Sequence, residues 1–182
     1  MQEFDKKSRD DEFFGIEDEE EDTQANKYMT FKVSKESFGI GIRFIREIIE
    51  LQTITEVPEM PDFLKGVINL RGKVIPVIDL RVRFKIGAKE FDDRTCIIII
   101  EVKDSSVGFI VDSVEEVAEI ADKNIEPAPN FRSETGKEKY ISGIGKVGDH
   151  IKIILDVEKI LHEDELNSLH KDLVEKTEGP VA

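Results

Sequence analysis

The residues of this chain that could do chemistry are few, and their spacing gives no catalytic motif. Asp79 and Asp156 each end a predicted strand, and a pair of carboxylates is one arrangement used for acid–base catalysis. Each aspartate also precedes a short apolar segment, where a carboxylate that caps a turn is the simpler interpretation. The sequence has no G-x-S-x-G, no phosphate-binding loop, no dinucleotide-binding glycine pattern and no zinc spacing. We therefore predict no catalytic residues and no enzymatic activity.

The remaining candidates for chemistry are one cysteine and three histidines. Cys96 begins the apolar run CIIII, which is typical of a buried core thiol, and a single cysteine cannot form an intrachain disulfide. His150, His162 and His170 are too scattered for a metal site. We predict neither a metal nor a cofactor.

One pattern occurs twice in the chain. Residues 63–80, FLKGVINLRGKVIPVIDL, align without a gap with residues 140–157, YISGIGKVGDHIKIILDV, at an offset of 77. Upstream, Phe31-x-Val33 and Phe38-Gly39-Ile40 match Ile100-x-Val102 and Val107-Gly108-Phe109 at an offset of 69. Such a repeat predicts two similar β subdomains with a cleft between them.

Arg71 breaks the symmetry of the repeat. It stands at the predicted Arg-Gly turn of the first copy, where the second copy has Gly148. A solvated turn arginine and a binding residue are both consistent with this position.

Many short strands with turn signals predict an all-β fold with minor helix, made of small closed or nearly closed barrels. Thr95–Val102 is apolar on both faces, which is typical of a central strand. Pro76 cannot donate to a ladder, so its strand should be an edge or carry a bulge. The apolar spacing of Phe44–Leu51 predicts a short helical turn. Pro127 and Pro129 indicate a loop.

The two ends of the chain differ in composition from its middle. Residues 1–26 are charged and poor in apolar residues, so we expect a disordered acidic tail. Within it, Phe13-Phe14-Gly15-Ile16 is an apolar island, either unstructured tail or a short docking motif. Residues 162–182 predict an amphipathic helix followed by a short tail, with Leu166, Leu169 and Leu173 on one face.

Charge and hydropathy exclude some classes of partner. The formal net charge of -14 gives no basic face for nucleic acid. No apolar stretch approaches the ~20 residues that span a bilayer. We expect a cytoplasmic protein that binds no nucleic acid and does not insert into the membrane.

The run from Phe63 to Leu80 resembles the signature of the CheW family of chemotaxis coupling proteins. The likeness extends over residues 27–161 and includes Phe38-Gly39-Ile40, Val107–Asp112 and Tyr140–Gly145. The resemblance implies two five-stranded SH3-like β-barrel subdomains and a non-enzymatic adaptor. It implies two partners, the cytoplasmic tip of methyl-accepting chemoreceptors and the regulatory domain of the histidine kinase CheA.

In this family the receptor binds in a groove between the barrels. Matched residue by residue, the resemblance places the receptor- and kinase-binding positions of this chain at Ile42, Ile45, Glu47, Gly66, Arg71, Cys96 and Gly108. Two alternatives stay open: a CheW-like regulatory piece of a kinase or receiver fusion, and a small-molecule sensor that binds in the inter-barrel cleft. The sensor would need convergent titratable groups, which the sequence does not show.

Overall fold

The computed structural model describes residues 24–128 and 140–161 of the 182-residue chain. Within these ranges the chain is mostly β, with short helical turns. The first copy of the repeat forms β1 (Lys27–Val33), β2 (Glu36–Gly41), η1 (Ile42–Phe44), β3 (Ile45–Glu50), β4 (Leu64–Leu70), β5 (Lys73–Asp79) and α1 (Leu80–Arg83). The second copy forms β6 (Cys96–Val102), β7 (Ser105–Val111), β8 (Ser113–Glu119), η2 (Asp122–Asn124), β9 (Ile125–Pro127), β10 (Ile141–Val147), β11 (His150–Leu155) and α2 (Val157–Ile160).

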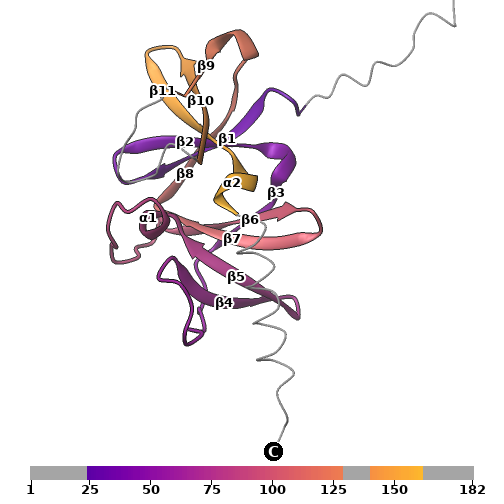
Figure 1. The fold of residues 1–182 in the computed structure, drawn as a ribbon, viewed down its shortest axis with the longest axis vertical. Coiled ribbons are helices and arrows are strands. Elements are labelled where there is room, and N and C mark those ends of the chain that lie inside the picture. The colour runs from indigo at the N-terminus through magenta and orange to yellow at the C-terminus, as the bar shows by residue number, and fades with distance from the viewer. Residues whose placement is uncertain (1–23, 129–139, 162–182) are drawn as a thin grey trace, which may run out of the picture.

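The strands form two sheets, which confirms the predicted pair of β subdomains (Figure 1). The terminal subdomain has the strand order β8-β1-β2-β11-β10-β9, and the central subdomain has the order β3-β6-β7-β5-β4. In each, five long strands are extended by a short outer segment. This segment is β9 in the terminal subdomain and a single bridge between Thr55 and Val67 in the central one.

The two copies of the repeat are interlocked, an arrangement that chain order alone does not reveal. The first copy gives β1 and β2 to the terminal subdomain and β3 to β5 to the central one. The second copy gives β6 and β7 to the central subdomain and β8 to β11 to the terminal one. Each subdomain therefore contains strands of both copies, and neither copy can close a sheet alone.

The repeat persists in the register of the strands. A parallel pair joins the copies in each subdomain, with Val77 opposite Gly108 in one and Ile154 opposite Gly39 in the other. These two pairs are equivalent by the offsets found in the sequence. The hairpins β4–β5 and β10–β11 also share a shift in register after their first residue pair. The duplicated sequence thus folds into duplicated backbone.

Two local predictions change in the structure. Phe44–Leu51 was expected to be a helical turn, but Ile45–Glu50 is strand β3 and only Ile42–Phe44 is a 3₁₀ turn. The β-branched isoleucines of this segment suit a strand, which pairs with β6. Residues 125–127, expected as a loop, form the short edge strand β9.

Pro76 lies in an internal strand rather than an edge strand. β5 lies between β7 and β4, but its parallel pairing with β7 covers only Val77–Asp79. Pro76 therefore falls just outside this ladder. The pairing of β5 with β4 carries its register shift one residue away.

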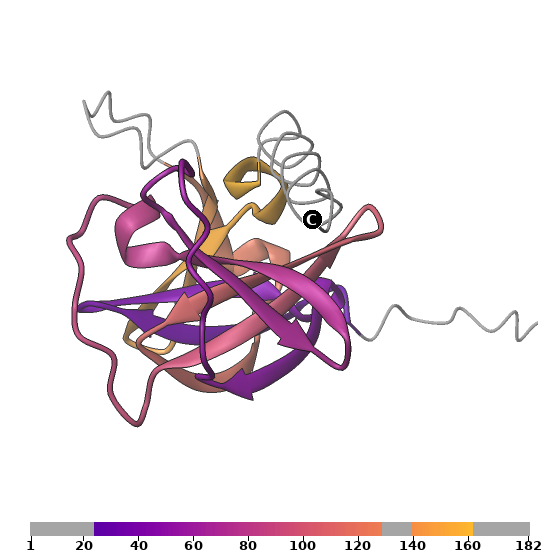
Figure 2. The ribbon, with the colours of Figure 1, turned by 90° about the horizontal axis from the view of Figure 1, so that it is seen from below.

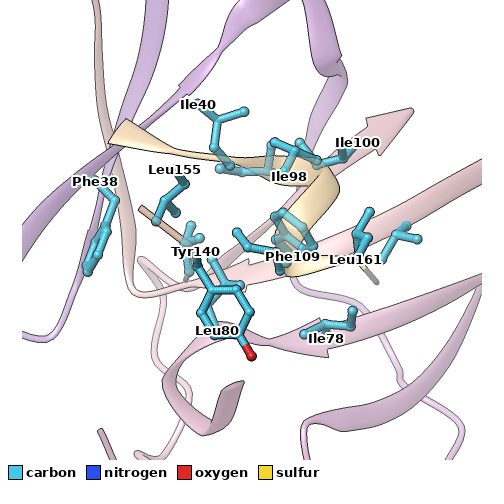
Figure 3. Packing of buried hydrophobic residues seen from close by; sticks show 14 of the residues in the cluster. Phe38, Ile40, Ile78, Leu80, Ile98, Ile100, Phe109, Tyr140, Leu155 and Leu161 are labelled. Carbon is cyan, nitrogen blue, oxygen red and sulfur yellow. The ribbon is translucent and has the colours of Figure 1, made fainter. Parts of the chain in front are cut away.

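The junction between the subdomains is filled by the main core at its centre, which differs from the open cleft expected from the repeat. Buried side chains of β1, β2 and β11 meet those of β5, β6 and β7 there (Figure 3). Figure 2, seen from below with the central subdomain nearest the viewer, shows the two sheets packed one behind the other. Because the largest apolar cluster spans both sheets, the two subdomains form one body.

The predicted acidic tail, the Phe13–Ile16 island and the predicted C-terminal helix with Leu166, Leu169 and Leu173 lie outside the described residues. Their expected conformations stay predictions.

Candidate protein-binding site

The hairpin between β4 and β5 positions the arginine that breaks the symmetry of the repeat. Arg71 and Gly72 both have positive φ, 52° and 80°, as a two-residue type I′ turn requires. The backbone N–H of Gly72 donates to Oδ1 of Asn69 at 2.9 Å, which fixes the turn. The guanidinium of Arg71 therefore projects from the tip, with its side chain 73% exposed.

Arg71 and Glu47 form a two-pronged ion pair across the edge of the central subdomain. Nη1 and Nη2 of Arg71 donate to Oε1 and Oε2 of Glu47 at 2.6 and 2.9 Å. This hydrogen bonding lowers the pKa of the Glu47 carboxyl and raises the pKa of Arg71. Since β3 and β4 are the two ends of the central sheet, the pair bridges its two edges.

Glu47 and Gly108 of the predicted site lie opposite the same residue of β6. Glu47 is opposite Ile99 in the β3–β6 ladder, and Ile99 is opposite Gly108 in the β6–β7 ladder. The structure thus places Glu47, Gly108 and the Arg71 hairpin in one sheet, although Gly108 itself is buried.

The two glycines of the predicted site lie in tight packing. A Cβ on Gly66 would lie 2.1 Å from the carbonyl oxygen of Thr55, and Gly66 has a φ of 150°. A Cβ on Gly108 would lie 2.7 Å from Cγ2 of Ile97. Both positions require glycine for the fold itself, and a direct contact of either with a partner stays a prediction.

Ile45 and Cys96 lie on the side of the site that faces the core. Ile45 and Cys96 are partly buried against the main core, while Ile42 is half-buried in η1. Burial raises the pKa of the Cys96 thiol, against a smaller opposite effect of a backbone hydrogen bond. Cys96 is therefore a core residue at the edge of the apolar run, as the sequence predicted, although it is only half-buried.

Sequence reasoning missed two exposed apolar side chains of the central subdomain. Ile48, which follows Glu47, is 38% exposed, and Val74, which follows the Arg71 hairpin, is 46% exposed. A further ion pair joins Arg46 of β3 to Glu101 of β6. Strict alternation along β3 would have revealed Ile48, had this segment been interpreted as a strand.

The repeated aspartates are caps, as predicted, rather than an acid–base pair. Oδ1 of Asp79 accepts from the N–H of Arg81 at the start of α1, and Oδ1 of Asp156 accepts from the N–H of Lys159 in α2. Burial raises the pKa of the Asp79 carboxyl. Backbone hydrogen bonds donated to this same carboxyl and the charge of Lys65 partly offset that rise. Each carboxylate is used to start a helix.

Two features are absent from residues 24–128 and 140–161, a metal-binding cluster and a membrane-spanning helix. No group of three or more His, Cys, Asp or Glu side chains in these ranges is arranged to hold a metal ion. No helix in the same ranges is long and apolar enough to cross a membrane.

The duplicated β scaffold carries the Arg71–Glu47 ion pair and exposed apolar side chains on its central subdomain. These features define a protein-binding module. The family model of the CheW-like domain matches residues 27–165, so the chain belongs to this family. The match includes both subdomains and the Arg71 hairpin.

Known proteins resemble the chain over most of its length. It is 35% identical over 145 residues to the chemotaxis protein CheW of Klebsiella aerogenes, covering 80% of this chain and 87% of that protein. It is 35% identical over 147 residues to the CheW of Bacillus subtilis, covering 80% and 93%. The scaffolding protein TtCheW of Thermoanaerobacter tengcongensis has a similar structure, with a TM-score of 0.69, 37% identity and coverage of 77% and 90%.

Proposed function

We propose that this chain is a non-enzymatic adaptor that couples methyl-accepting chemoreceptors to the histidine kinase CheA in bacterial chemotaxis. Membership of the CheW-like family supports the proposal, and so does the likeness to a solved protein described as a scaffolding protein. In this proposal the chain works in the cytoplasm, at receptor arrays beside the inner face of the membrane.

The observation that carries the proposal is the exposed Arg71–Glu47 pair. A receptor tip is a helical hairpin, so it offers carboxylates, helix-end carbonyls and an apolar stripe. The guanidinium of Arg71 has five donors in a planar fork, and the pair uses only two of its nitrogens on Glu47. The edge around it also offers Ile48 and Val74 as exposed apolar contacts.

Ile42, Ile45, Glu47, Gly66, Arg71, Cys96 and Gly108 serve this function in two ways. Glu47 and Arg71 are the proposed contacts with the partner. The buried or half-buried members hold β3, β4 and the hairpin in place behind them. A contact of this kind transmits a signal only if its free energy differs between two states of the kinase.

The test is an assembly experiment with three components. A receptor cytoplasmic fragment, CheA and this chain are mixed and sedimented, with each pair as a control. We expect CheA to sediment with the receptor fragment only when the chain is present, and kinase activity to change in the same sample. Sedimentation of CheA that does not depend on the chain would contradict the adaptor role.

A further inference from the structure

A hollow lies at the edge of the junction between the subdomains, away from the Arg71 hairpin. It is a cavity of about 580 Å³ between the β1–β2 turn, the segment after α1 and the β10–β11 hairpin. Its floor is apolar and buried, formed by Phe38, Phe84 and Leu155. The rings of Phe38 and Phe84 are stacked with their centroids 5.3 Å apart. Figure 3 shows Phe38 and Leu155 at the margin of the main core.

The walls and rim of this cavity differ in chemistry. Ile86, Ile141 and Ile153 form half-buried apolar walls. Lys35 and Lys85, both exposed, lie on the rim together with Ser34 and the single acid Glu36. The cavity therefore suits an apolar side chain whose neighbours are acidic.

The equivalent position of the central subdomain is covered. By the offset of 77, Ile141 and Ile153 correspond to Leu64 and Pro76, which are both buried. Phe38 corresponds to Val107 by the offset of 69, and Leu155 corresponds to Ile78 by the offset of 77. Val107 and Ile78 are also buried. One half of the duplicated scaffold thus covers these positions, whereas the other leaves half-buried isoleucines around a hollow.

The chain itself carries a segment with the required chemistry. Phe13-Phe14-Gly15-Ile16 follows Asp10-Asp11-Glu12 and precedes the run Glu17–Asp22. We propose that this segment docks in the lysine-rimmed cavity, with its aromatic side chains on the Phe38–Phe84 floor and its flanking acids beside Lys35 and Lys85. The apolar contact would supply most of the binding, and the opposite charges would orient the segment.

The length of chain before β1 permits this contact within one molecule. Seven residues lie between Ile16 and Gln24, and the eight steps of an extended chain from one to the other cover about 26–29 Å. Gln24 is held beside Lys27, whose N–H donates to its carbonyl at 3.1 Å. From Lys27 the seven residues of β1 lead to Ser34 at the cavity, a distance of about 23 Å at most. Tethering also keeps the local concentration of the segment in the ~mM range.

The test uses the full chain labelled for amide NMR. The double substitution Phe13→Ser and Phe14→Ser should shift the amide signals of Lys35, Ile86 and Ile153 and leave those around Arg71 unchanged. A peptide of residues 9–21, added to this variant, should restore the parental positions. Signals of the cavity that are identical in parent and variant would overturn the proposal. Shifts that grow with protein concentration would also overturn it, because they would show binding between molecules.

A second experiment tests the lysines at the rim of the cavity by substitution. In the background of Phe13→Ser and Phe14→Ser, which leaves the cavity open to the peptide, Lys35→Glu with Lys85→Glu changes only exposed side chains and should weaken binding of the peptide about fivefold. Lys123→Glu with Lys159→Glu, both exposed and outside the cavity lining, is the charge-matched control in the same background and should leave the affinity for the peptide unchanged. Equal weakening by both variants would show a general charge effect and would contradict the assigned cavity.

Discussion

The two subdomains have similar backbone folds, but different kinds of side chain occupy their interiors. The interior of the central subdomain holds six buried aliphatic side chains: Ile68, Ile75, Val77, Ile97, Ile99 and Ile110. At the equivalent positions the terminal subdomain has Gly145, Lys152, Ile154, Tyr28, Thr30 and Gly41. Only one of these six is aliphatic, so the second interior cannot rely on apolar burial to the same extent.

Polar contacts replace apolar ones inside the terminal subdomain. Nζ of Lys152 lies 2.9 Å from Oε2 of Glu115, and Oγ of Ser37 donates to Oε1 of the same carboxylate at 3.0 Å. Oγ1 of Thr30, which is fully buried, donates to the carbonyl of Glu116 at 2.8 Å. The comparison shows that strand register and turns specify this fold, while either kind of interior can stabilise it.

The largest effect is expected when the two interiors are exchanged at one position. Ile75→Lys would bury an ammonium among isoleucines, with an expected cost of about 4 kcal/mol of unfolding free energy. The reverse change, Lys152→Ile, leaves Glu115 with its Ser37 hydrogen bond and partial solvent contact, so we expect a cost of about 1–2 kcal/mol. Urea denaturation measures both. Equal costs would contradict the difference between the two interiors.

A smaller difference is expected between two equivalent glycines. Gly66→Ala places a Cβ 2.1 Å from a backbone oxygen at a φ of 150°, for an expected cost of about 3 kcal/mol. In Gly143→Ala the nearest atom is Cγ2 of Ile125 at 2.6 Å, on the edge strand β9, so about 1–2 kcal/mol is expected. Urea midpoints of the two variants provide the comparison, and a larger loss at Gly143 would be inconsistent with this geometry.

The unfolding free energy should depend on pH because the Glu115 carboxyl of the terminal subdomain titrates. Burial raises the pKa of this carboxyl, but hydrogen bonds from Lys152 and Ser37 and the nearby lysine charges outweigh it, so the pKa is lowered. A lowered pKa stabilises the fold above the unfolded value of about 4.3, and this contribution is lost as the pH falls through the folded value.

The corresponding measurement is the urea midpoint at pH 7 and at pH 4. Glu115→Gln should lose less stability on acidification than the parent, because its side chain does not titrate. Glu116→Gln, at an exposed neighbouring position, should fall as the parent does. A parent and a Glu115→Gln variant with the same loss would exclude Glu115 as a source of the acid sensitivity.

The smallest effect on stability is expected at the tip of the Arg71 hairpin. Arg71 and Gly148 are both exposed, and both already have positive φ, 52° and 58°. Arg71→Glu should therefore leave the melting temperature of the chain within about 2 °C of the parent. A large fall in calorimetry would mean that the Arg71–Glu47 pair stabilises the fold and is not chiefly a binding element.

Much of this architecture could be predicted from the repeat. The gapless match of residues 63–80 and 140–157 anticipated two similar hairpins, two capping aspartates and the turn that presents Arg71. The exchange of strands between the copies could not be predicted, because it depends on pairings far apart in the chain. The apolar spacing of residues 44–51 fits a helix face or a strand, and only the ladder with β6 decides between them.

The binding role of the candidate site stays a prediction, and only the positions of its residues can be compared with the structure. The sequence selected Arg71 and Glu47 by resemblance, and the structure places them in contact. The Ile48 and Val74 side chains were missed because exposure is a property of the folded surface. Gly66 and Gly108 were grouped with the contacts, although their surroundings give them a packing role.

The measurement that tests the central claim most directly compares Arg71→Glu with Gly148→Glu. Both variants place a glutamate at an exposed hairpin tip, one in each subdomain, at a residue whose φ is positive, so they are matched in the charge that they introduce. Each is sedimented with a receptor cytoplasmic fragment and CheA. We predict that Arg71→Glu loses receptor binding and recruitment of CheA, while Gly148→Glu retains both. If both variants bind like the parent, or both fail alike, the site does not lie at the Arg71 edge of the central subdomain.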